Sequence, residues 1–198
     1  MNNLKWNWAS CPPIQRIMGK RSNFQRIERD YYPTPIEAVR PLVPHLHRAK
    51  FWYTEPCAGD GRLVGHLGDL TQGNARPEYV CDLAPQIPEV EQFDALGIQS
   101  ASMFITNPPW DRKALHPLIE HLSSIAPTWL LFDADWMHTK QSAPFIPRLQ
   151  KVVSVGRVKW IEDSKMTGKD NCCWYLFDIN NDQPSQFFGR LPTNTTEG

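Results

Sequence analysis

Residues 51–61 read FWYTEPCAGDG, a short apolar strand that leads into a turn of small residues. Two glycines in this turn, Gly59 and Gly61, let another molecule approach the backbone closely. Asp82 ends a second apolar run, 21 positions after Gly61. An acidic residue at this spacing commonly holds the two hydroxyl groups of a ribose. The pattern predicts a nucleoside-binding cleft at the carboxyl ends of the strands of an α/β sheet.

The turn favours one kind of nucleoside over others. A dinucleotide fingerprint needs a third glycine where this chain has Val64, and the chain contains no Gly-Lys-Ser/Thr run of a P-loop. The turn carries Glu55 and Asp60 instead. Carboxylates suit an ammonium group and repel a pyrophosphate. S-adenosylmethionine carries an ammonium, a sulfonium and a ribose, so it is the predicted cofactor.

The remaining apolar pattern extends this sheet. Residues 113–125 have apolar side chains at three- and four-residue steps and predict a helix. A shorter helix is expected over residues 34–43, with Thr34 as its N-cap, Pro35 as its first residue and Glu37 closing a capping box. Continuous apolar runs between helices indicate a mostly parallel twisted sheet. The last two runs are expected to form an antiparallel hairpin. The predicted strands are residues 51–54, 79–81, 103–106, 128–132, 152–155 and 174–177.

The chain divides into three parts by composition. Residues 1–30 form a basic and aromatic arm, residues 31–180 the folded domain, and residues 181–198 a polar C-terminal tail. Trp6 and Trp8 in the arm suit three roles equally: tracking single-stranded or bent DNA, covering the domain's own apolar surface, or contacting a partner subunit.

The bulk composition excludes several classes. The 21 basic and 21 acidic residues balance, so no global field points to nucleic acid or membrane. No apolar run approaches the roughly 18 residues of a membrane span, and the N-terminus has no signal-peptide core. The five cysteines are an odd number without CxxC spacing, which is typical of reduced thiols in a cytoplasmic protein. We expect no metal site.

A second motif, Asn107-Pro108-Pro109-Trp110, follows the predicted strand at residues 103–106. Two consecutive prolines supply no N–H donors and stiffen the chain, and they push Asn107 toward an extended conformation. The product is a rigid turn with an amide side chain, free carbonyl oxygens and one aromatic face. Such a turn suits a planar group that bears an NH₂, such as adenine.

These residues predict a direct transfer to an amine. If the Asn107 side-chain carbonyl and the Pro108 backbone carbonyl each accept one N–H, the nitrogen is drawn toward tetrahedral geometry. Its lone pair then points at the sulfonium methyl, and the two oxygens stabilise the developing positive charge. Trp110 is expected to stack on the target base, which contributes about 1–3 kcal/mol. The predicted catalytic residues are Asn107, Pro108 and Trp110.

From residue 31 to residue 177 the motifs and their order resemble those of class I S-adenosylmethionine-dependent DNA adenine-N6 methyltransferases, in particular small phage-type members. The resemblance implies a Rossmann-like fold. It implies that the acid after the second strand, Asp82, binds the ribose, and that Asp94 accepts from the cofactor's adenine amino group. The full set implied to bind the cofactor is Tyr32, Thr34, Pro35, Glu55, Cys57, Ala58, Gly59, Gly61, Asp82, Asp94 and Asn107.

The resemblance also implies a target side. The stretch Gly168-Lys169-Asp170-Asn171 is similar to a target-side loop, although an ordinary polar hairpin loop has the same composition. The residues expected to contact the target are Pro109, Trp110, Lys165, Lys169 and Asn171. Two departures stand out. The aromatic residue after the prolines is more often Tyr or Phe. The 17 residues between Trp110 and Thr128 leave no room for a separate recognition domain, so we expect relaxed sequence specificity.

The expected activity is methyl transfer to N6 of a flipped-out adenine in DNA. RNA adenine and the glutamine side-chain amide present the same planar NH₂ group, so they stay open as acceptors. A non-catalytic protein that binds cofactor or DNA is the third alternative. The expected partners are DNA and a second copy of the chain, and the expected location is the cytoplasm, or the host cytoplasm for a viral protein.

Overall fold

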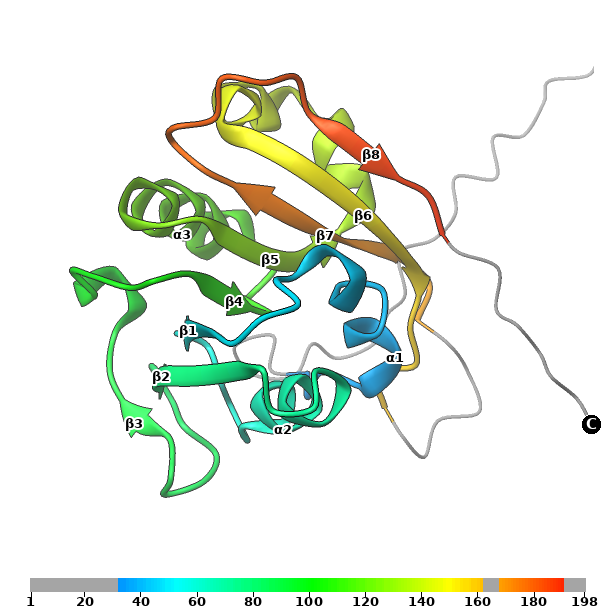
Figure 1. Ribbon diagram of the computed structural model, residues 1–198. Coiled ribbons are helices and arrows are strands. Elements are labelled where there is room, and N and C mark those ends of the chain that lie inside the picture. The colour runs from blue at the N-terminus through cyan, green and yellow to red at the C-terminus, as the bar shows by residue number, and fades with distance from the viewer. Residues whose placement is uncertain (1–31, 162–167, 191–198) are drawn as a thin grey trace, which may run out of the picture.

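A computed structural model describes residues 32–161 and 168–190. In this part of the chain eight strands form one sheet in the order β3-β2-β1-β4-β5-β7-β6-β8 (Figure 1). Strands β1 to β5 pair in parallel, and β7 runs antiparallel between β5 and β6. The strands are β1 Phe51–Glu55, β2 Ala75–Asp82, β3 Glu91–Gln92, β4 Phe104–Thr106, β5 Thr128–Asp133, β6 Leu149–Arg157, β7 Asn171–Phe177 and β8 Gln186–Phe188. The predicted mostly parallel sheet with a C-terminal antiparallel hairpin is confirmed.

Helices pack on both faces of this sheet. Helix α2 (Arg62–Leu70) joins β1 to β2, and α3 (Arg112–Ile125) joins β4 to β5. Figure 1 shows α1 (Ile36–Val39) and α2 near β1 and β2, with α3 on the other side of β4 and β5. Short 3₁₀ helices complete the described elements: η3 Val43–His45, η4 Ala95–Gly97, η5 Ala134–His138 and η6 Lys140–Arg148. No described helix has the length and apolar character required to cross a membrane.

Alternation along the central strands divides the core into two clusters. Successive side chains of a strand point to opposite faces of the sheet. In β5, Trp129 and Leu131 therefore join α1 and α2 in one cluster, while Leu130 and Phe132 join α3 in the other. Burial on both faces explains why the central strands read as continuous apolar runs.

Two expectations at the ends of the domain need correction. The first helix spans only Ile36–Val39, and its N-cap is Pro35 without a side-chain bond. Thr34 is not the cap, because its hydroxyl accepts a hydrogen bond from the side chain of Asn107. Pro41 and Pro44 then prevent a longer regular helix.

The segment expected to be a polar tail contains a strand. Residues 186–188 form β8, which pairs in parallel with β6 through Lys151–Gln186, Val152–Phe187 and Val153–Phe188. Two consecutive phenylalanines supply the β propensity that the polar composition around them concealed. Phe187 is nevertheless largely exposed, so β8 forms a weakly covered edge of the sheet.

Candidate functional site

A cavity of about 300 Å³ lies at the carboxyl ends of β1, β2 and β4. This end of a parallel sheet is where α/β folds bind their ligands. Three segments form most of the wall: residues 32–34 before α1, residues 56–60 after β1, and residues 82–86 after β2. The other lining residues are Leu63, Asp94, Ala95, Leu96, Asn107, Pro109, Lys113, Ala114, Pro117 and Leu118.

The glycine turn is built for close approach and is fastened to β2. Gly59 and Gly61 adopt positive φ angles of 55° and 73°, which L side chains rarely adopt. The Gly59 amide donates to Asp82 Oδ2 at 2.9 Å, and the Ala84 amide donates to Asp82 Oδ1 at 2.7 Å. Each carboxylate oxygen keeps a further acceptor position. Asp82 therefore holds two loops together and still presents acceptor capacity at the cavity.

A second acid lies at another part of the cavity wall. Asp94 Oδ1 accepts from the Leu96 amide at 3.0 Å and so fixes the start of η4. Leu96, Pro117 and Leu118 line the same cavity and supply apolar surface. Lys113, from the first turn of α3, brings a cation to the wall. Sequence reasoning missed Lys113, although it follows the Asn107 motif by one short turn.

Glu55 lies in the protein interior rather than on the cavity wall. Its side chain is 1% exposed, and its Oε2 atom has no hydrogen-bond partner. Burial raises the pKa of this carboxyl well above its ordinary value, and the nearby carboxylates of Asp82 and Asp60 raise it further. A buried carboxyl without a partner is costly when charged. A cation bound next to Glu55 would relieve that cost.

The amide of Asn107 is fixed at both of its polar atoms. Its Nδ2 atom donates to the Tyr32 carbonyl oxygen at 3.2 Å and to Thr34 Oγ1 at 3.1 Å. Its Oδ1 atom accepts from Trp110 Nε1 at 3.3 Å. The carbonyl of Tyr32 can only accept and the indole of Trp110 can only donate, so the two ends of the amide cannot be exchanged. One lone pair of Oδ1 is left for a ligand.

Trp110 does not line the cavity. Its Nε1 atom also contacts the Leu131 carbonyl oxygen at 3.2 Å, and its ring packs against both core clusters. The ring meets Trp160 edge to face at 5.5 Å, and Trp160 meets Tyr32 in the same way at 6.4 Å. Sequence reasoning missed Trp160. The available signal was an aromatic residue shortly after a strand and next to the polar loop already suspected of contacting the target.

The other predicted residues fall into two groups. Tyr32, Thr34, Cys57, Ala58, Gly59, Asp82, Asp94, Asn107 and Pro109 line one cavity. Five other predicted residues are not among the lining residues of that cavity: Pro35, Glu55, Gly61, Pro108 and Trp110. Lys169 and Asn171 are exposed at the start of β7, and Lys165 lies outside the described residues.

Gly168, which precedes Lys169, lies against Trp160 and the end of β6. The Gly168 amide donates to the Val158 carbonyl oxygen at 2.8 Å. A Cβ atom at Gly168 would lie only 2.8 Å from that oxygen and 3.1 Å from the Trp160 ring. This close contact places one end of the loop against Trp160.

Cys57 lines the cavity, but its chemistry is that of an inert thiol. Burial raises the pKa of Cys57, and the charge of Asp82 raises it further. The thiolate required of a nucleophile is therefore disfavoured. Cys57, Cys81, Cys172 and Cys173 are all free thiols. Within the described ranges, no group of three or more His, Cys, Asp or Glu side chains is arranged to hold a metal ion.

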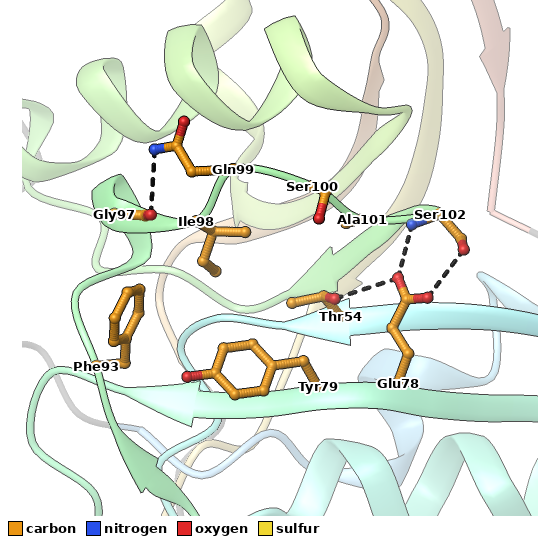
Figure 2. Close-up of a pocket in the computed structure, with 10 residues that line it drawn as sticks. All are labelled: Thr54, Glu78, Tyr79, Phe93, Gly97, Ile98, Gln99, Ser100, Ala101 and Ser102. Atoms are coloured by element: carbon orange, nitrogen blue, oxygen red, sulfur yellow. Dashed lines mark hydrogen bonds between the residues drawn. The ribbon is translucent and has the colours of Figure 1, made fainter.

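A second cavity of about 600 Å³ lies between β2 and the segment that enters β4 (Figure 2). Tyr79 and Phe93 line it with ring centroids 6.1 Å apart. Glu78 closes one end, because its carboxylate accepts from the Ser102 amide at 2.6 Å, the Ser102 hydroxyl at 2.9 Å and the Thr54 hydroxyl at 3.3 Å. None of the predicted site residues lies here, and the charged group present is already bonded. The smaller cavity is the better candidate despite its size.

No family model and no curated protein matches this sequence. Among solved structures, the chain is similar to the protein PH1948 of Pyrococcus horikoshii, described as an RNA methyltransferase. The TM-score is 0.50 at 15% identity, over 80% of this chain and 92% of that one.

The fold is the Rossmann-like class I methyltransferase fold.

A chain from a type I R-M system also matches, with a TM-score of 0.50 at 15% identity over 86% of this chain and 47% of that one. A dimethyladenosine transferase from Plasmodium falciparum has a TM-score of 0.49 at 15% identity, over 74% of this chain and 62% of that one. Methyltransferases of this fold use S-adenosylmethionine. At 15% identity these likenesses concern the fold, so the chemistry of this chain has to be argued from its own residues.

Proposed function

We propose that this protein is an S-adenosylmethionine-dependent methyltransferase that acts on the N6 amino group of adenine, with DNA as its leading substrate. The observation that carries the proposal is the fixed amide of Asn107, which has one acceptor position left at the end of β4. An acceptor held in this way suits an N–H of an incoming amine. RNA adenine is the second candidate, because the similar protein PH1948 is described as an RNA methyltransferase.

The cavity fits the cofactor in size and in polar groups. Its volume of about 300 Å³ falls in the range of small-molecule sites. Asp82 offers acceptors for ribose hydroxyl groups, and Asp94 with Leu96 forms an apolar slot with one acid at its edge. Glu55 does not line this cavity, so we assign the ammonium group to the acidic wall residue Asp60. When bound, S-adenosylmethionine supplies an electrophilic methyl group on its sulfonium.

The residues of the turn act on the amine of the acceptor. The free lone pair of Asn107 Oδ1 accepts one N–H, and the Pro108 carbonyl accepts the other. Among the described residues, no hydrogen bond occupies the Pro108 carbonyl. Two acceptors draw the nitrogen lone pair out of conjugation and stabilise the positive charge that develops on nitrogen. Since the amide is already oriented, the reaction requires little rearrangement of the protein.

The aromatic group around Trp160 is the proposed target side. The ring of Trp160 contacts the rings of both Tyr32 and Trp110 beside Asn107, and these rings offer faces and edges to a flipped base. The Nε1 atom of Trp110 is used within the protein, so we assign its ring to packing against the base and its N–H to orienting Asn107. Lys169, Asn171 and Lys165 remain proposed contacts to phosphate or base.

Transfer of labelled methyl groups tests the proposal. The purified chain is incubated with tritiated S-adenosylmethionine and, separately, with adenine-containing DNA, the same sequence as RNA, and a glutamine-containing protein extract. Label in DNA supports the leading assignment, and label in RNA alone transfers the assignment to RNA. Label in protein alone, or cofactor binding without any transfer, contradicts the adenine assignment.

A further inference from the structure

The hydroxyl of Thr34 belongs to two parts of the molecule at once. It lines the cofactor cavity, and the residue is only 6% exposed. Its Oγ1 atom also lies 3.1 Å from Asn107 Nδ2, at the catalytic turn. The residue therefore contacts both the space for the cofactor and the amide that is proposed to receive the target amine.

The direction of this hydrogen bond follows from chemistry. Asn107 Nδ2 can only donate, so Thr34 Oγ1 accepts and keeps its own O–H to donate elsewhere. Among the described residues, this O–H has no protein acceptor. A buried O–H that donates to no acceptor costs free energy, even when the oxygen accepts a bond. The missing acceptor is thus expected from a molecule in the cavity, and an oxygen at the amino-acid end of the cofactor has the right chemistry.

We propose that Thr34 is a positioning residue that couples occupation of the cofactor cavity to the orientation of Asn107. This inference rests on the proposed function. When the O–H of Thr34 donates to the bound molecule, the hydroxyl can no longer rotate, and its oxygen becomes a stronger acceptor for Asn107 Nδ2. The amide is then held more tightly with Oδ1 toward the target. Coupling between two sites is reciprocal, so cofactor and target each raise the affinity of the other.

The other bonds of Asn107 do not reach the cofactor in the same way. The Tyr32 carbonyl holds Nδ2 from the backbone, and Trp110 holds Oδ1 from the target side. Neither group has an O–H that can bond to a molecule in the cavity. If Thr34 is removed, the amide stays near its place through these two bonds, but it no longer senses the cofactor. Thr34→Val should therefore abolish coupling while both ligands still bind.

The experiment compares the parent protein with Thr34→Val, Thr34→Ser and the control Thr128→Val. Thr128 is a buried threonine at the first position of β5 and does not line the cavity. Its hydroxyl donates to the Ala126 carbonyl. Affinity for an adenine-containing oligonucleotide is measured with and without S-adenosylhomocysteine, so that no turnover occurs. In the parent, Thr34→Ser and Thr128→Val, we expect tighter binding with S-adenosylhomocysteine by about fivefold or more. In Thr34→Val we expect the ratio of the two oligonucleotide affinities, with and without S-adenosylhomocysteine, to be near one.

A second measurement does not depend on the target. In ¹⁵N-labelled protein, S-adenosylhomocysteine should shift the side-chain amide resonances of Asn107 further in the parent and in Thr34→Ser than in Thr34→Val, where only the direct effect of the nearby ligand is left. Equal ratios and equal shifts in the parent and Thr34→Val would overturn the inference and leave the proposed function standing. A parent protein that binds neither S-adenosylhomocysteine nor the oligonucleotide would overturn both.

Discussion

The side-chain nitrogen of Asn107 lies 3.1 Å from the hydroxyl oxygen of Thr34, a residue 73 positions earlier in the chain. The same nitrogen bonds to the Tyr32 carbonyl, so the segment before α1 takes both amide hydrogens. The segment before α1 and the turn after β4 therefore form one site. The sequence motifs place Thr34 and Asn107 near the cofactor but do not show the hydrogen bond that joins them.

The N–H of Trp110 should contribute to rate more than to target affinity. Trp110→Phe keeps an aromatic ring but removes the donor to Asn107 Oδ1 and to the Leu131 carbonyl. One lost hydrogen bond is worth about 0.5–1.5 kcal/mol, which corresponds to a fall in kcat of about two- to thirteenfold. We expect the KM for the oligonucleotide to change little. Steady-state kinetics with varied oligonucleotide checks this, and a rise in KM with constant kcat would contradict it.

Glu55 should make the protein without cofactor less stable as the pH rises. Burial raises the pKa of Glu55 in the folded state, and the Asp82 and Asp60 carboxylates raise it further. Above the ordinary value of 4.5 the unfolded chain releases this proton while the folded chain retains it, so the free energy of unfolding falls. Glu55→Gln has no proton to release at this position, so its free energy of unfolding does not fall for this reason. Its thermal unfolding temperature should match the parent near pH 4 and exceed it increasingly toward pH 8.

The control for this measurement is Glu120→Gln, an exposed glutamate on α3. It should follow the parent at every pH. Because Glu55 does not line the cavity, added S-adenosylhomocysteine should stabilise the parent and Glu55→Gln to a similar extent. Parallel pH curves for the parent and Glu55→Gln would show that Glu55 is not held in its neutral form.

Asp82 should serve both the fold and the cofactor. Asp82→Ala removes the acceptor for the Gly59 and Ala84 amides. Hydrogen bonds to charged groups contribute about 1.5–3 kcal/mol each, and partial exposure reduces this, so we expect a loss of about 2–3 kcal/mol. The Kd for S-adenosylhomocysteine should rise at least about tenfold. Calorimetry and urea unfolding measure both, with the exposed Asp69→Ala as control. Unchanged cofactor affinity would remove Asp82 from the site.

The variant Glu78→Ala should show which of the two cavities binds the cofactor. Glu78→Ala breaks the bonds from β2 to Ser102 and Thr54 that Figure 2 shows, at a cost of about 1–2 kcal/mol. Because Glu78 lies in the other cavity, affinity for S-adenosylhomocysteine should stay within about twofold of the parent. Titration calorimetry on the folded variant checks this. A large loss of affinity would mean that the larger cavity takes part in cofactor binding.

The central strands could be predicted from sequence because both of their faces are buried. The apolar runs at residues 51–54, 103–106 and 128–132 match β1, β4 and β5 to within one or two residues. The sequence pattern predicts only the end of β2, because Arg76, Pro77 and Glu78 are exposed and interrupt the apolar run. β3 and β8, of two and three residues, are too short to show a period.

The site was predictable where topology alone brings residues together. The carboxyl ends of parallel strands meet at one edge, so Asp82 and Asn107 had to lie near the glycine turn. The place of Thr34 depends on how a segment without regular structure crosses that edge. The position of Trp160 depends on the direction in which the chain leaves β6. The burial of Glu55 depends on how the elements around β1 pack. None of these leaves a periodic signal in the sequence.

The measurement that tests the central claim most directly is single-turnover methyl transfer to an adenine-containing oligonucleotide by the parent, Asn107→Ala and Asn107→Asp. Because Asn107 lines the cavity, the rates are compared at saturating S-adenosylmethionine, and binding of S-adenosylhomocysteine by each variant is measured separately. We expect Asn107→Ala to lose about 10²–10³-fold in rate, as for loss of one preorganised group at a developing charge. Asn107→Asp keeps an acceptor but loses the bonds of Nδ2 to Tyr32 and Thr34, so we expect an intermediate rate. Transfer at the parental rate by Asn107→Ala would contradict the account.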